Sequence, residues 1–398
     1  MPKKTDNLDE LLTRGVDTIY PSKGALSKRL ADGKPLSLYL GIDPSGADLH
    51  IGHTVALQKL RQFQKAGHKV ILLIGNFTGQ TGDPTDKRAA RKPLTKAQVM
   101  ANAKHYQKQA ARVLDFKGKN PVELRFNADW LGNLKFSEVA ELAGHFTVQQ
   151  MLERDMFADR LKGGKPISLR EFLYPLMQGY DSVAMQVDLE IGGTDQTFNM
   201  LAGRKLAKEY LGKEKFVLTV PILADSSGAK IGKTEGNAIE ILGKPEELYG
   251  QLMGLPDEVI GDALEWTTSV PLAEVGEVRK LAKQNPRDAK MRLAKAVVAE
   301  YQGDAAAKKA EQHFVTVFQK HELPDKVPEK KLPTLKPRNV RNLLVDLDLA
   351  ASTSEARRLI EQGAVRRNEE IHAGATEVVP VPGDTWRVGK KKIIRIAD

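Results

Sequence analysis

The sequence predicts an α/β fold built on a parallel sheet, with a helical region and a small α+β domain after it. The first observation is the order strand, helix, buried strand over residues 36–74, which is typical of a βαβ unit. The second is the run VILLI at 70–74, apolar at every position, as in a strand that helices cover on both faces. The third is a change to helical periodicity from about residue 245, which separates the sheet from the second half of the chain.

Composition restricts the class of protein. A chain of 398 residues, 41% hydrophobic and 28% charged with both signs present, fits an ordered protein of two or three domains. The formal charge of +10 fits a nucleic-acid partner without requiring one. The absence of cysteine excludes disulfides, thiolate zinc sites and cysteine nucleophiles, and it fits a cytoplasmic location. The run at 70–74 is too short to span a bilayer, so we expect no membrane segment.

Each element of the sheet domain follows from a local pattern. Residues 36–42 are apolar and end at the Asp43-Pro44 turn, which predicts a strand. Residues 49–66 carry apolar side chains at helical spacing and end at Gly67. The remaining predictions are a strand at 70–74, a glycine-rich loop at 78–86, helices at 95–114 and 168–182, a strand at 187–191, a helix from about 195 and a last strand at 216–223.

The second half of the chain divides into three parts. Residues 245–318 have mostly helical periodicity. Four prolines among lysines between 324 and 337 predict a semi-rigid linker, because proline interrupts helices and removes a backbone donor from sheets. We therefore divide the chain into a sheet domain at 1–243, a helical domain at 244–322, a linker at 323–337 and a small domain at 338–398.

The first of two chemical motifs is HIGH at 50–53, just beyond a predicted strand and at the start of a predicted helix. A helix N-terminus has unpaired N–H groups and the positive end of the helix dipole, which suit an anion. His50 and His53 share one helix face, and Gly52 removes a side chain where a flat base would lie against the backbone. The histidines by themselves would favour a buried helix start without function.

The second motif, KIGKT at 230–234, places two lysines and a hydroxyl on a loop that Gly228 and Gly232 would make flexible. ATP is a polyanion, and both motifs suit a polyanion. Either motif alone is weak support. The two in this order, each in its expected setting, predict a site that binds ATP from two sides.

Together with four further segments, these motifs resemble the class I aminoacyl-tRNA synthetases, and most closely the tyrosyl-tRNA synthetases. The further segments are a first strand and turn at 39–44 (YLGIDP), a second loop at 82–84 (GDP), an amino-acid-binding helix at 174–181 (YPLMQGYD) and a ribose-binding turn at 192–196 (GGTDQ). The resemblance implies a Rossmann-like catalytic domain, an anticodon-region helical domain and a homodimer. It also implies ATP as a substrate with Mg²⁺ accompanying it, although the sequence shows no protein cage for the ion.

The implied reaction activates L-tyrosine with ATP, giving tyrosyl-adenylate and pyrophosphate, and then transfers tyrosine to the 3′ end of its tRNA. The tyrosine carboxylate is the nucleophile, so the protein must position the substrates and stabilise charge. The resemblance assigns catalytic roles at the phosphates to His50, His53, Lys87, Arg91, Lys230, Lys233 and Thr234. It assigns ATP binding to Ser45, Gly52, Gly193 and Asp195. For Lys87 and Arg91 the alternative is a solvated basic loop.

The resemblance assigns the tyrosine pocket to Tyr39, Asp83, Tyr174, Gln178, Asp181 and Gln196. Asp83, Tyr174 and Gln178 would hold the ammonium group, and Gln196 would reach the carboxyl end. The spacing of Tyr174, Gln178 and Asp181 puts them on one helix face, a polar stripe that would be costly unless it faced a site. Tyr39 and Asp181 would bond the phenol hydroxyl and reject phenylalanine, which would leave both unsatisfied.

The carboxyl-terminal segment predicts a capped helix over 352–363, then a strand. Arg357, Arg358, Arg366 and Arg367 would form one basic edge. The segment resembles the small RNA-binding domain of a small-subunit ribosomal protein, including a closing strand pair at 386–392. This implies phosphate contacts to tRNA that weaken with salt. The alternative is a protein–protein module with a solvated basic face.

Three alternatives stay open for the whole chain. A tryptophanyl-tRNA synthetase shares the fold and the lysine loop, but the pairing of Tyr39 with Asp181 argues against it. A synthetase-derived RNA-binding protein without catalysis is disfavoured by the intact motifs at 50–53 and 230–234. A nucleotidyltransferase that uses no tRNA would not need the carboxyl-terminal segment. Glu190, where many members of the family have glutamine, departs from the pattern and receives no role.

Overall fold

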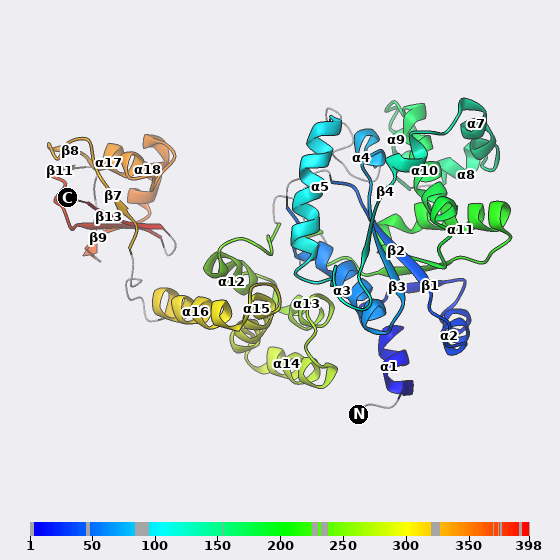
Figure 1. The fold of residues 1–398 in the computed structure, drawn as a ribbon. Coiled ribbons are helices and arrows are strands. Elements are labelled where there is room, and N and C mark those ends of the chain that lie inside the picture. The colour runs from blue at the N-terminus through cyan, green and yellow to red at the C-terminus, as the bar shows by residue number, and fades with distance from the viewer. Residues whose placement is uncertain are drawn as a thin grey trace. The chain divides into compact units, whose positions relative to one another are not determined.

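The computed structural model describes residues 4–44, 48–83, 95–153, 155–224, 230–231, 238–319, 327–368, 370–372, 374, 376–389 and 392–397. The chain forms two compact units, Met1–Lys308 and Lys309–Asp398. Figure 1 shows their helices and strands. Within the described ranges, none of the helices combines the length and the apolarity that crossing a bilayer requires.

The first unit is built on a six-stranded sheet with the order β1-β6-β5-β2-β3-β4. The short strand β1 pairs antiparallel with β6, and all other neighbours are parallel. The strands are β1 (Thr18–Tyr20), β2 (Ser37–Ile42), β3 (Lys69–Ile74), β4 (Glu123–Phe126), β5 (Leu189–Gly193) and β6 (Phe216–Val220). After β2 the chain adds β3 and β4 on one side and later β5 and β6 on the other. This change of direction makes the gap between β2 and β5 a switch point, where parallel sheets bind ligands.

Helices cover both faces of this sheet (Figure 1), with α3 on one face and α10 and α11 on the other. They alternate with the strands because each βαβ crossover must return to the start of the next parallel strand. The helices of this part are α1 (Lys4–Leu11), α2 (Lys23–Ala31), α3 (Ile51–Lys65), α4 (Thr78–Thr81), α5 (Lys96–Ala110), α6 (Ala128–Leu131), α7 (Phe136–Gly144), α8 (Val148–Leu152), α9 (Asp155–Lys162), α10 (Leu169–Met185), the 3₁₀ turn η1 (Thr194–Gln196) and α11 (Thr197–Leu211).

The patterned elements of the sheet domain are confirmed within a few residues. The strands expected at 36–42, 70–74, 187–191 and 216–223 are β2, β3, β5 and β6, and the expected helices are α3, α5, α10 and α11. Two local predictions are wrong. The glycine-rich loop predicted at 78–86 begins with the one-turn helix α4, and Gly192 and Gly193 end strand β5 instead of forming a separate turn.

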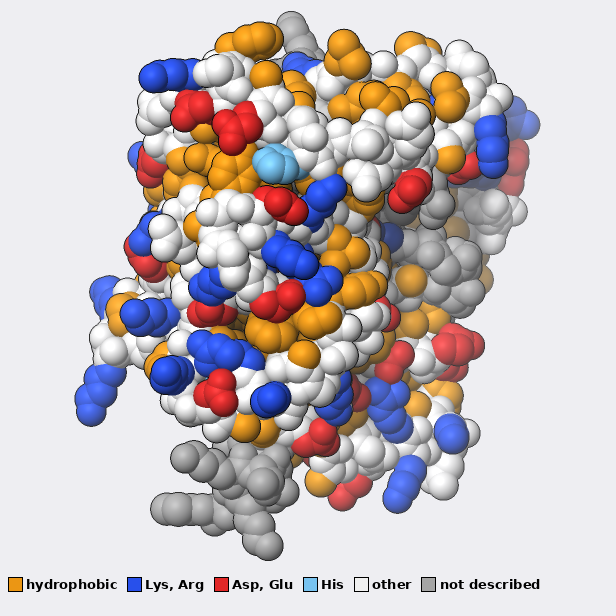
Figure 2. Space-filling view, turned by 90° about the vertical axis from the view of Figure 1, so that its right-hand side faces the viewer, with side chains coloured by type: hydrophobic (Ala, Val, Ile, Leu, Met, Phe, Trp, Pro, Cys, Tyr) orange, Lys and Arg blue, Asp and Glu red, His pale blue; other side chains and the backbone are white. Residues whose placement is uncertain are grey.

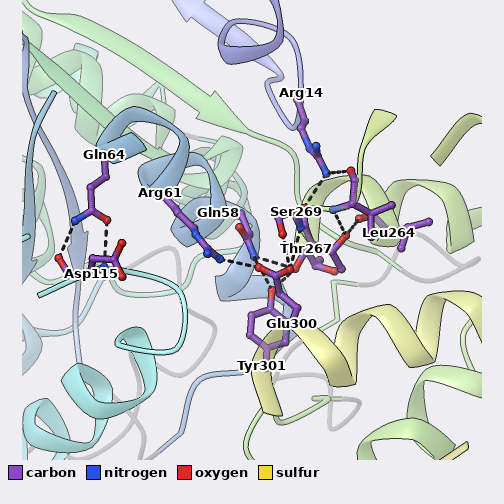
Figure 3. A network of polar contacts seen from close by, with 12 residues as sticks. Arg14, Gln58, Arg61, Gln64, Asp115, Leu264, Thr267, Ser269, Glu300 and Tyr301 are labelled. Carbon is purple, nitrogen blue, oxygen red and sulfur yellow. Dashed lines mark hydrogen bonds and ion pairs between the residues drawn. The ribbon is translucent and has the colours of Figure 1, made fainter. Parts of the chain in front are cut away.

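The predicted helical region after the sheet is confirmed. It consists of α12 (Pro245–Met253), η2 (Asp257–Val259), α13 (Ile260–Thr267), α14 (Leu272–Gln284), α15 (Pro286–Gln302), α16 (Asp304–Phe314) and the π-helical turn η3 (Val315–Gln319). A polar network joins α3 to α13 and α15 (Figure 3). Glu300 accepts hydrogen bonds from Gln58 Nε2 at 3.0 Å and Ser269 Oγ at 2.7 Å, and it forms an ion pair with Arg61 at 2.7 Å.

The second unit packs two helices against short strands around the fully buried Trp386. A five-stranded sheet has the order β10-β9-β12-β13-β7, and a two-stranded sheet joins β11 to β8. Its elements are β7 (Glu329–Lys330), β8 (Arg338–Asn339), α17 (Val340–Asp346), α18 (Thr353–Glu361), β9 (Val365–Arg367), β10 (Glu370–Ile371), β11 (Glu377–Val378), β12 (Thr385–Val388) and β13 (Lys392–Ile396). The helix α18, the strand after it and the closing pair β12–β13 agree with the sequence patterns. Strand β7, however, lies inside the range predicted as a linker and pairs with β13.

Candidate active site

A cavity of about 420 Å³ opens at the carboxyl ends of β2 and β5. Its volume is in the range of pockets that bind small molecules. The sequence-predicted residues that line it are Tyr39, His50, Gly52, His53, Asp83, Tyr174, Gln178, Asp181, Gly193, Asp195, Gln196 and Lys230. Residues far apart in the chain thus meet at the switch point of the sheet. The predicted site residues Ser45, Lys87, Arg91, Lys233 and Thr234 lie outside the described residues.

His50 and His53 form the start of α3 as a reciprocal cap. The Nδ1 atom of His50 accepts a hydrogen bond from Gly52 N at 3.2 Å, and the Nδ1 atom of His53 accepts one from His50 N at 3.2 Å. In its neutral form each ring therefore carries its proton on Nε2. Both rings, 3.9 Å apart between centroids, can present an N–H donor together with the helix N-terminus, a combination that suits phosphate oxygens.

Gly52 lies where the two chemical motifs touch. A Cβ atom at this position would lie 3.0 Å from the His50 ring and 3.1 Å from the Ile231 carbonyl oxygen. The backbone of the second motif therefore lies directly on the start of α3. Ile51 N also donates to Ile239 O at 2.9 Å, which holds the segment after the lysine loop against the same helix end.

Lys230, the first lysine of the second motif, reaches across the cavity to the turn after β5. Its Nζ atom lies 2.8 Å from Asp195 Oδ2, and both side chains are partly exposed. The turn itself is tight, since a Cβ atom on Gly193 would lie 2.5 Å from Asp195 Oδ1. Asp195 and Lys230 are thus held together by an ion pair among the residues that line the cavity.

The floor of the cavity carries a buried carboxylate and a buried phenol. Asp181 accepts hydrogen bonds from Trp130 Nε1 at 2.7 Å and Asn127 Nδ2 at 3.3 Å, and the Tyr39 hydroxyl lies 3.0 Å from Ser182 Oγ. Burial raises the pKa of Asp181 and of Tyr39 well above their ordinary values. This floor offers both an acceptor and a hydroxyl to a polar group at the end of an aromatic substrate.

Asp43 is a second carboxylate of the cavity, partly buried, which the sequence patterns indicated only as part of a turn. It accepts hydrogen bonds from Thr78 Oγ1 at 2.7 Å and Tyr174 Oη at 2.8 Å. Burial, opposed by these two bonds and reinforced by the charge of Asp83, raises its pKa from 3.8 to about 7. Asp83 accepts a hydrogen bond from Gln196 Nε2 at 2.7 Å. The position of Asp43 after a strand at the switch point was the signal that could have identified it.

Several residues of the site were not predicted. Asn127 and Trp130 come from the segment at the start of α6, whose sequence has no motif, and Ser182 looks like an ordinary helix residue. Glu190, left without a role, lines the cavity and forms an ion pair with the buried Lys215. Only the fold brings Asn127 and Glu190 to the cavity and places Trp130, Ser182 and Lys215 against the residues that line it.

The four arginines of the second unit do not share one face. Arg357 and Arg358 are exposed on α18, where Arg357 forms an ion pair with Glu361 at 2.7 Å. Arg366 is exposed on β9, whereas its neighbour Arg367 bonds to Asp384 and lies 5.6 Å from the Trp386 ring. Adjacent strand residues point to opposite sheet faces, so Arg367 is turned toward the core. A role of these arginines in RNA binding stays a prediction.

The chain resembles known proteins over most of its length. Residues 31–319 match the family model described as "tRNA synthetases class I (W and Y)". A tyrosine–tRNA ligase of Moorella thermoacetica is 48% identical over 97% of this chain and 94% of its own length. One of Carboxydothermus hydrogenoformans is 44% identical over 97% of each chain.

A solved structure gives the same result at the level of fold. A C-terminally truncated mitochondrial tyrosyl-tRNA synthetase of Coccidioides posadasii superposes with a TM-score of 0.64 at 26% identity, covering 77% of this chain and 91% of the other. The family match covers most of the chain, and the curated relatives match over nearly their full length. The chain therefore belongs to the class I aminoacyl-tRNA synthetases and, within them, to the tyrosyl-tRNA synthetases.

Proposed function

We propose that this protein activates L-tyrosine with ATP and transfers the tyrosyl group to the 3′ end of its tRNA. The observation that carries the choice of amino acid is the floor of the cavity, where Asp181 and the Tyr39 hydroxyl are both buried. An aromatic ring that ends in a hydroxyl would donate to Asp181 and lie against the Tyr39 hydroxyl oxygen. Phenylalanine has no hydroxyl, so it would fill the same space without gaining a hydrogen bond to the buried floor and would bind more weakly. Tryptophan would have to place a larger ring over the same floor.

In the first step the tyrosine carboxylate oxygen forms a bond to the α-phosphorus of ATP, and the bond to the bridging oxygen of pyrophosphate breaks. No protein nucleophile or base is needed, since the carboxylate is already ionised. Asp43, Asp83, Tyr174 and Gln178 would hold the ammonium group, with Gln196 at the carboxyl end. His50 and His53 would donate to phosphate oxygens, which stabilises the charge that builds there.

The lysine motif would act later than the histidines. Lys230 would leave Asp195 for the departing pyrophosphate, and Asp195 would then accept from the ribose hydroxyls. Lys233, Thr234, Lys87, Arg91 and Ser45 are proposed to complete the phosphate contacts, and Gly52 and Gly193 to give the nucleotide room. A contact made mainly in the transition state raises the rate more than one made equally in the ground state.

Mg²⁺ is proposed to arrive with ATP instead of residing in the protein. In the part of the chain that the structure describes, no group of three or more His, Asp or Glu side chains is arranged to hold a metal ion. A magnesium ion bound through substrate phosphates fits such a site. The ion would neutralise phosphate charge, while the residues named above position the reacting groups.

We further propose a cytoplasmic homodimer formed through the face shown in Figure 2, where apolar side chains gather among charged ones. The most exposed large apolar side chains on α7 to α10 are Phe136, Val148, Leu161 and Leu169. Exposed apolar side chains commonly mark an interface where they form a contiguous patch. A Phe136→Glu, Leu169→Glu variant should sediment as a monomer where the unchanged protein sediments as a dimer; a dimeric variant would contradict this interface.

The proposed activity is tested by ATP–pyrophosphate exchange with a panel of amino acids. Exchange with tyrosine alone, followed by charging of tyrosine tRNA, is the expected result. Exchange with tryptophan would favour the other branch of the family. No exchange with any amino acid by folded protein would leave only an RNA-binding role.

A further inference from the structure

An ion pair is buried directly beneath the cavity. Glu190 lines the cavity wall, and its exposed fraction is 1%. The exposed fraction of Lys215 is 0%. The Lys215 Nζ atom donates to Glu190 Oε2 and, at 3.2 Å, to the Met200 carbonyl oxygen. Removing two charges from water costs several kcal/mol for each ion, and a buried pair is seldom retained for stability alone. Its position suggests a role in the site.

The carboxylate of Glu190 connects the two ends of the proposed tyrosine pocket. Its Oε1 atom accepts a hydrogen bond from Gln178 Nε2 at 3.0 Å, on the side proposed for the ammonium group. Its Oε2 atom lies 3.4 Å from Ser182 Oγ, and Ser182 is bonded to the Tyr39 hydroxyl, on the side proposed for the phenol. Glu190 and Tyr39 are also direct neighbours in the register of β5 and β2.

We propose that Glu190, paired with Lys215, is a positioning residue that orients Gln178 toward the substrate ammonium group and the Ser182–Tyr39 pair toward the substrate hydroxyl. The proposal rests on the tyrosine-binding function proposed above. Glu190 acts through Gln178, Ser182 and Tyr39 and takes no part in bond making or breaking.

The orientation of Gln178 follows from hydrogen-bond chemistry. An ionised carboxylate only accepts hydrogen bonds, so Gln178 must turn its NH₂ group toward Glu190. The amide oxygen of Gln178 then points the other way. An ammonium group only donates, so it requires an oxygen and would be repelled by an amide turned the wrong way. A neutral residue at position 190 that both donates and accepts would allow either orientation of Gln178.

On the side proposed for the substrate phenol, nearby negative charges determine the protonation state of Tyr39. Burial, followed by the negative charges of Glu190 and Asp181, raises the pKa of Tyr39 well above its ordinary value. Tyr39 therefore keeps its proton at neutral pH and donates it to Ser182, because Ser182 donates its own proton to Glu190. Ser182 holds the Tyr39 oxygen from one side at 3.0 Å, while Glu190 holds Ser182. The hydroxyl is thus fixed before the substrate arrives, which is what selectivity for a hydroxyl requires.

Lys215 is held in place by helix packing. A Cβ atom on Gly203 would lie 2.6 Å from Lys215 Nζ and 2.9 Å from Ser182 Oγ. Only glycine at this position of α11 lets the lysine reach between α10 and α11. Lys215 immediately precedes β6, and Glu190 is on the neighbouring β5, so the sheet sets the distance between the two charges.

The test compares Glu190→Gln, Lys215→Met and the double variant E190Q/K215M with Lys59→Met. The double variant removes both charges together, so it leaves no unpaired buried ion. Lys59→Met is the matched control, because Lys59 is an equally buried lysine whose Nζ atom bonds to Leu11 O, away from the cavity. Thermal unfolding checks that each variant is folded, and ATP–pyrophosphate exchange gives KM for tyrosine and ATP separately.

For the double variant we expect KM for tyrosine to rise about tenfold or more while KM for ATP stays within about twofold. Binding of tyrosinol, which keeps the ammonium group and the phenol, should weaken more than binding of 3-(4-hydroxyphenyl)propionate, which lacks the ammonium group. Discrimination between tyrosine and phenylalanine should fall. Lys59→Met should lower thermal stability and leave both KM values and the discrimination unchanged.

A folded double variant with unchanged KM for tyrosine and unchanged discrimination would overturn the proposal. If the double variant does not fold, Glu190→Asp decides the question. It keeps the charge near Lys215 but withdraws the carboxylate from Gln178, so KM for tyrosine should still rise; an unchanged KM overturns the proposal. Failure of the function itself is separate, because the unchanged protein would then show no exchange with tyrosine.

Discussion

At the scale of single residues, Asp43 links proton binding to substrate binding. Its pKa is raised to about 7, mainly by burial, so it is partly protonated at neutral pH. A substrate ammonium group would favour the ionised form, because opposite charges close together stabilise each other. We expect KM for tyrosine to fall as pH rises through about 7, and the Asp43→Asn variant to lose this dependence. The measurement is tyrosine binding from pH 5.5 to 8.5; an unchanged pH profile in Asp43→Asn would exclude Asp43 as the cause.

The same residue should affect stability in the opposite direction. The pKa of Asp43 is higher in the folded protein than its ordinary value of 3.8, so the folded state binds the proton more tightly than the unfolded chain. The free energy of unfolding contributed by this group therefore falls as pH rises from about 4 to about 7. Tyrosine binding and maximal stability thus favour different protonation states of one carboxyl group, which is common at functional sites.

At the scale of elements, His50 at the start of α3 has both a structural role and a proposed chemical role. The ring caps the helix by accepting from Gly52 N, and its other nitrogen is proposed to contact phosphate. His50→Ala should lower the free energy of unfolding by about 1 kcal/mol and reduce kcat for exchange. His50→Asn keeps an acceptor for the cap, so it should regain the stability but not the rate. Thermal unfolding and exchange kinetics separate the two roles; full activity of His50→Asn would show that His50 only caps the helix.

The elements also show what the sequence could predict. Strands β2 and β3 and helix α3 have apolar patterns long enough to identify. The motif at 50–53 could be placed because it follows one predicted strand and begins one predicted helix. Strands β1 and β4 have only 3 and 4 residues, too few for a period to emerge. The pairing of Glu190 with Lys215 could not be predicted, because it depends on the register of β5 against β6. The same holds for Asn127 and Trp130, which approach Asp181 only through the packing of α6 and α10 at the sheet edge.

At the scale of the whole molecule, Glu300 holds the helix that starts at His50 against the helical region (Figure 3). Burial acts to raise the pKa of Glu300, but hydrogen bonds from Ser269 and Gln58 and the charge of Arg61 outweigh it, so the pKa lies below its ordinary value of 4.5. The stabilisation is therefore present above about pH 4.5 and is lost as pH falls through the lower pKa of the folded state.

Removal of the Glu300 carboxylate tests whether this network holds α3 against the helical region. In Glu300→Ala, Gln58 and Arg61 would lose their hydrogen-bond and ion-pair partner at a largely buried position. This should lower the free energy of unfolding by about 2 kcal/mol or more. Urea denaturation at pH 7 measures the change. Glu123→Ala is the control, because Glu123 forms an exposed ion pair with Arg125 and its loss should cost less than about 1 kcal/mol. An equal loss of unfolding free energy in the two variants would show that the network does not hold α3 against the helical region.

The second unit should matter for tRNA and not for tyrosine activation, because the whole cavity is built from the first unit. Arg357 and Arg358 are exposed on α18, where phosphate contacts would depend on charge. An Arg357→Glu, Arg358→Glu variant should keep normal ATP–pyrophosphate exchange, while KM for tRNA rises and the dependence of tRNA binding on salt becomes shallower.

A variant with Lys28→Glu and Lys34→Glu changes net charge equally at exposed positions of the first unit and should leave KM for tRNA near its original value. Normal aminoacylation by the arginine variant at physiological salt would contradict RNA binding through this helix, and equal losses in both variants would reduce the effect to overall charge.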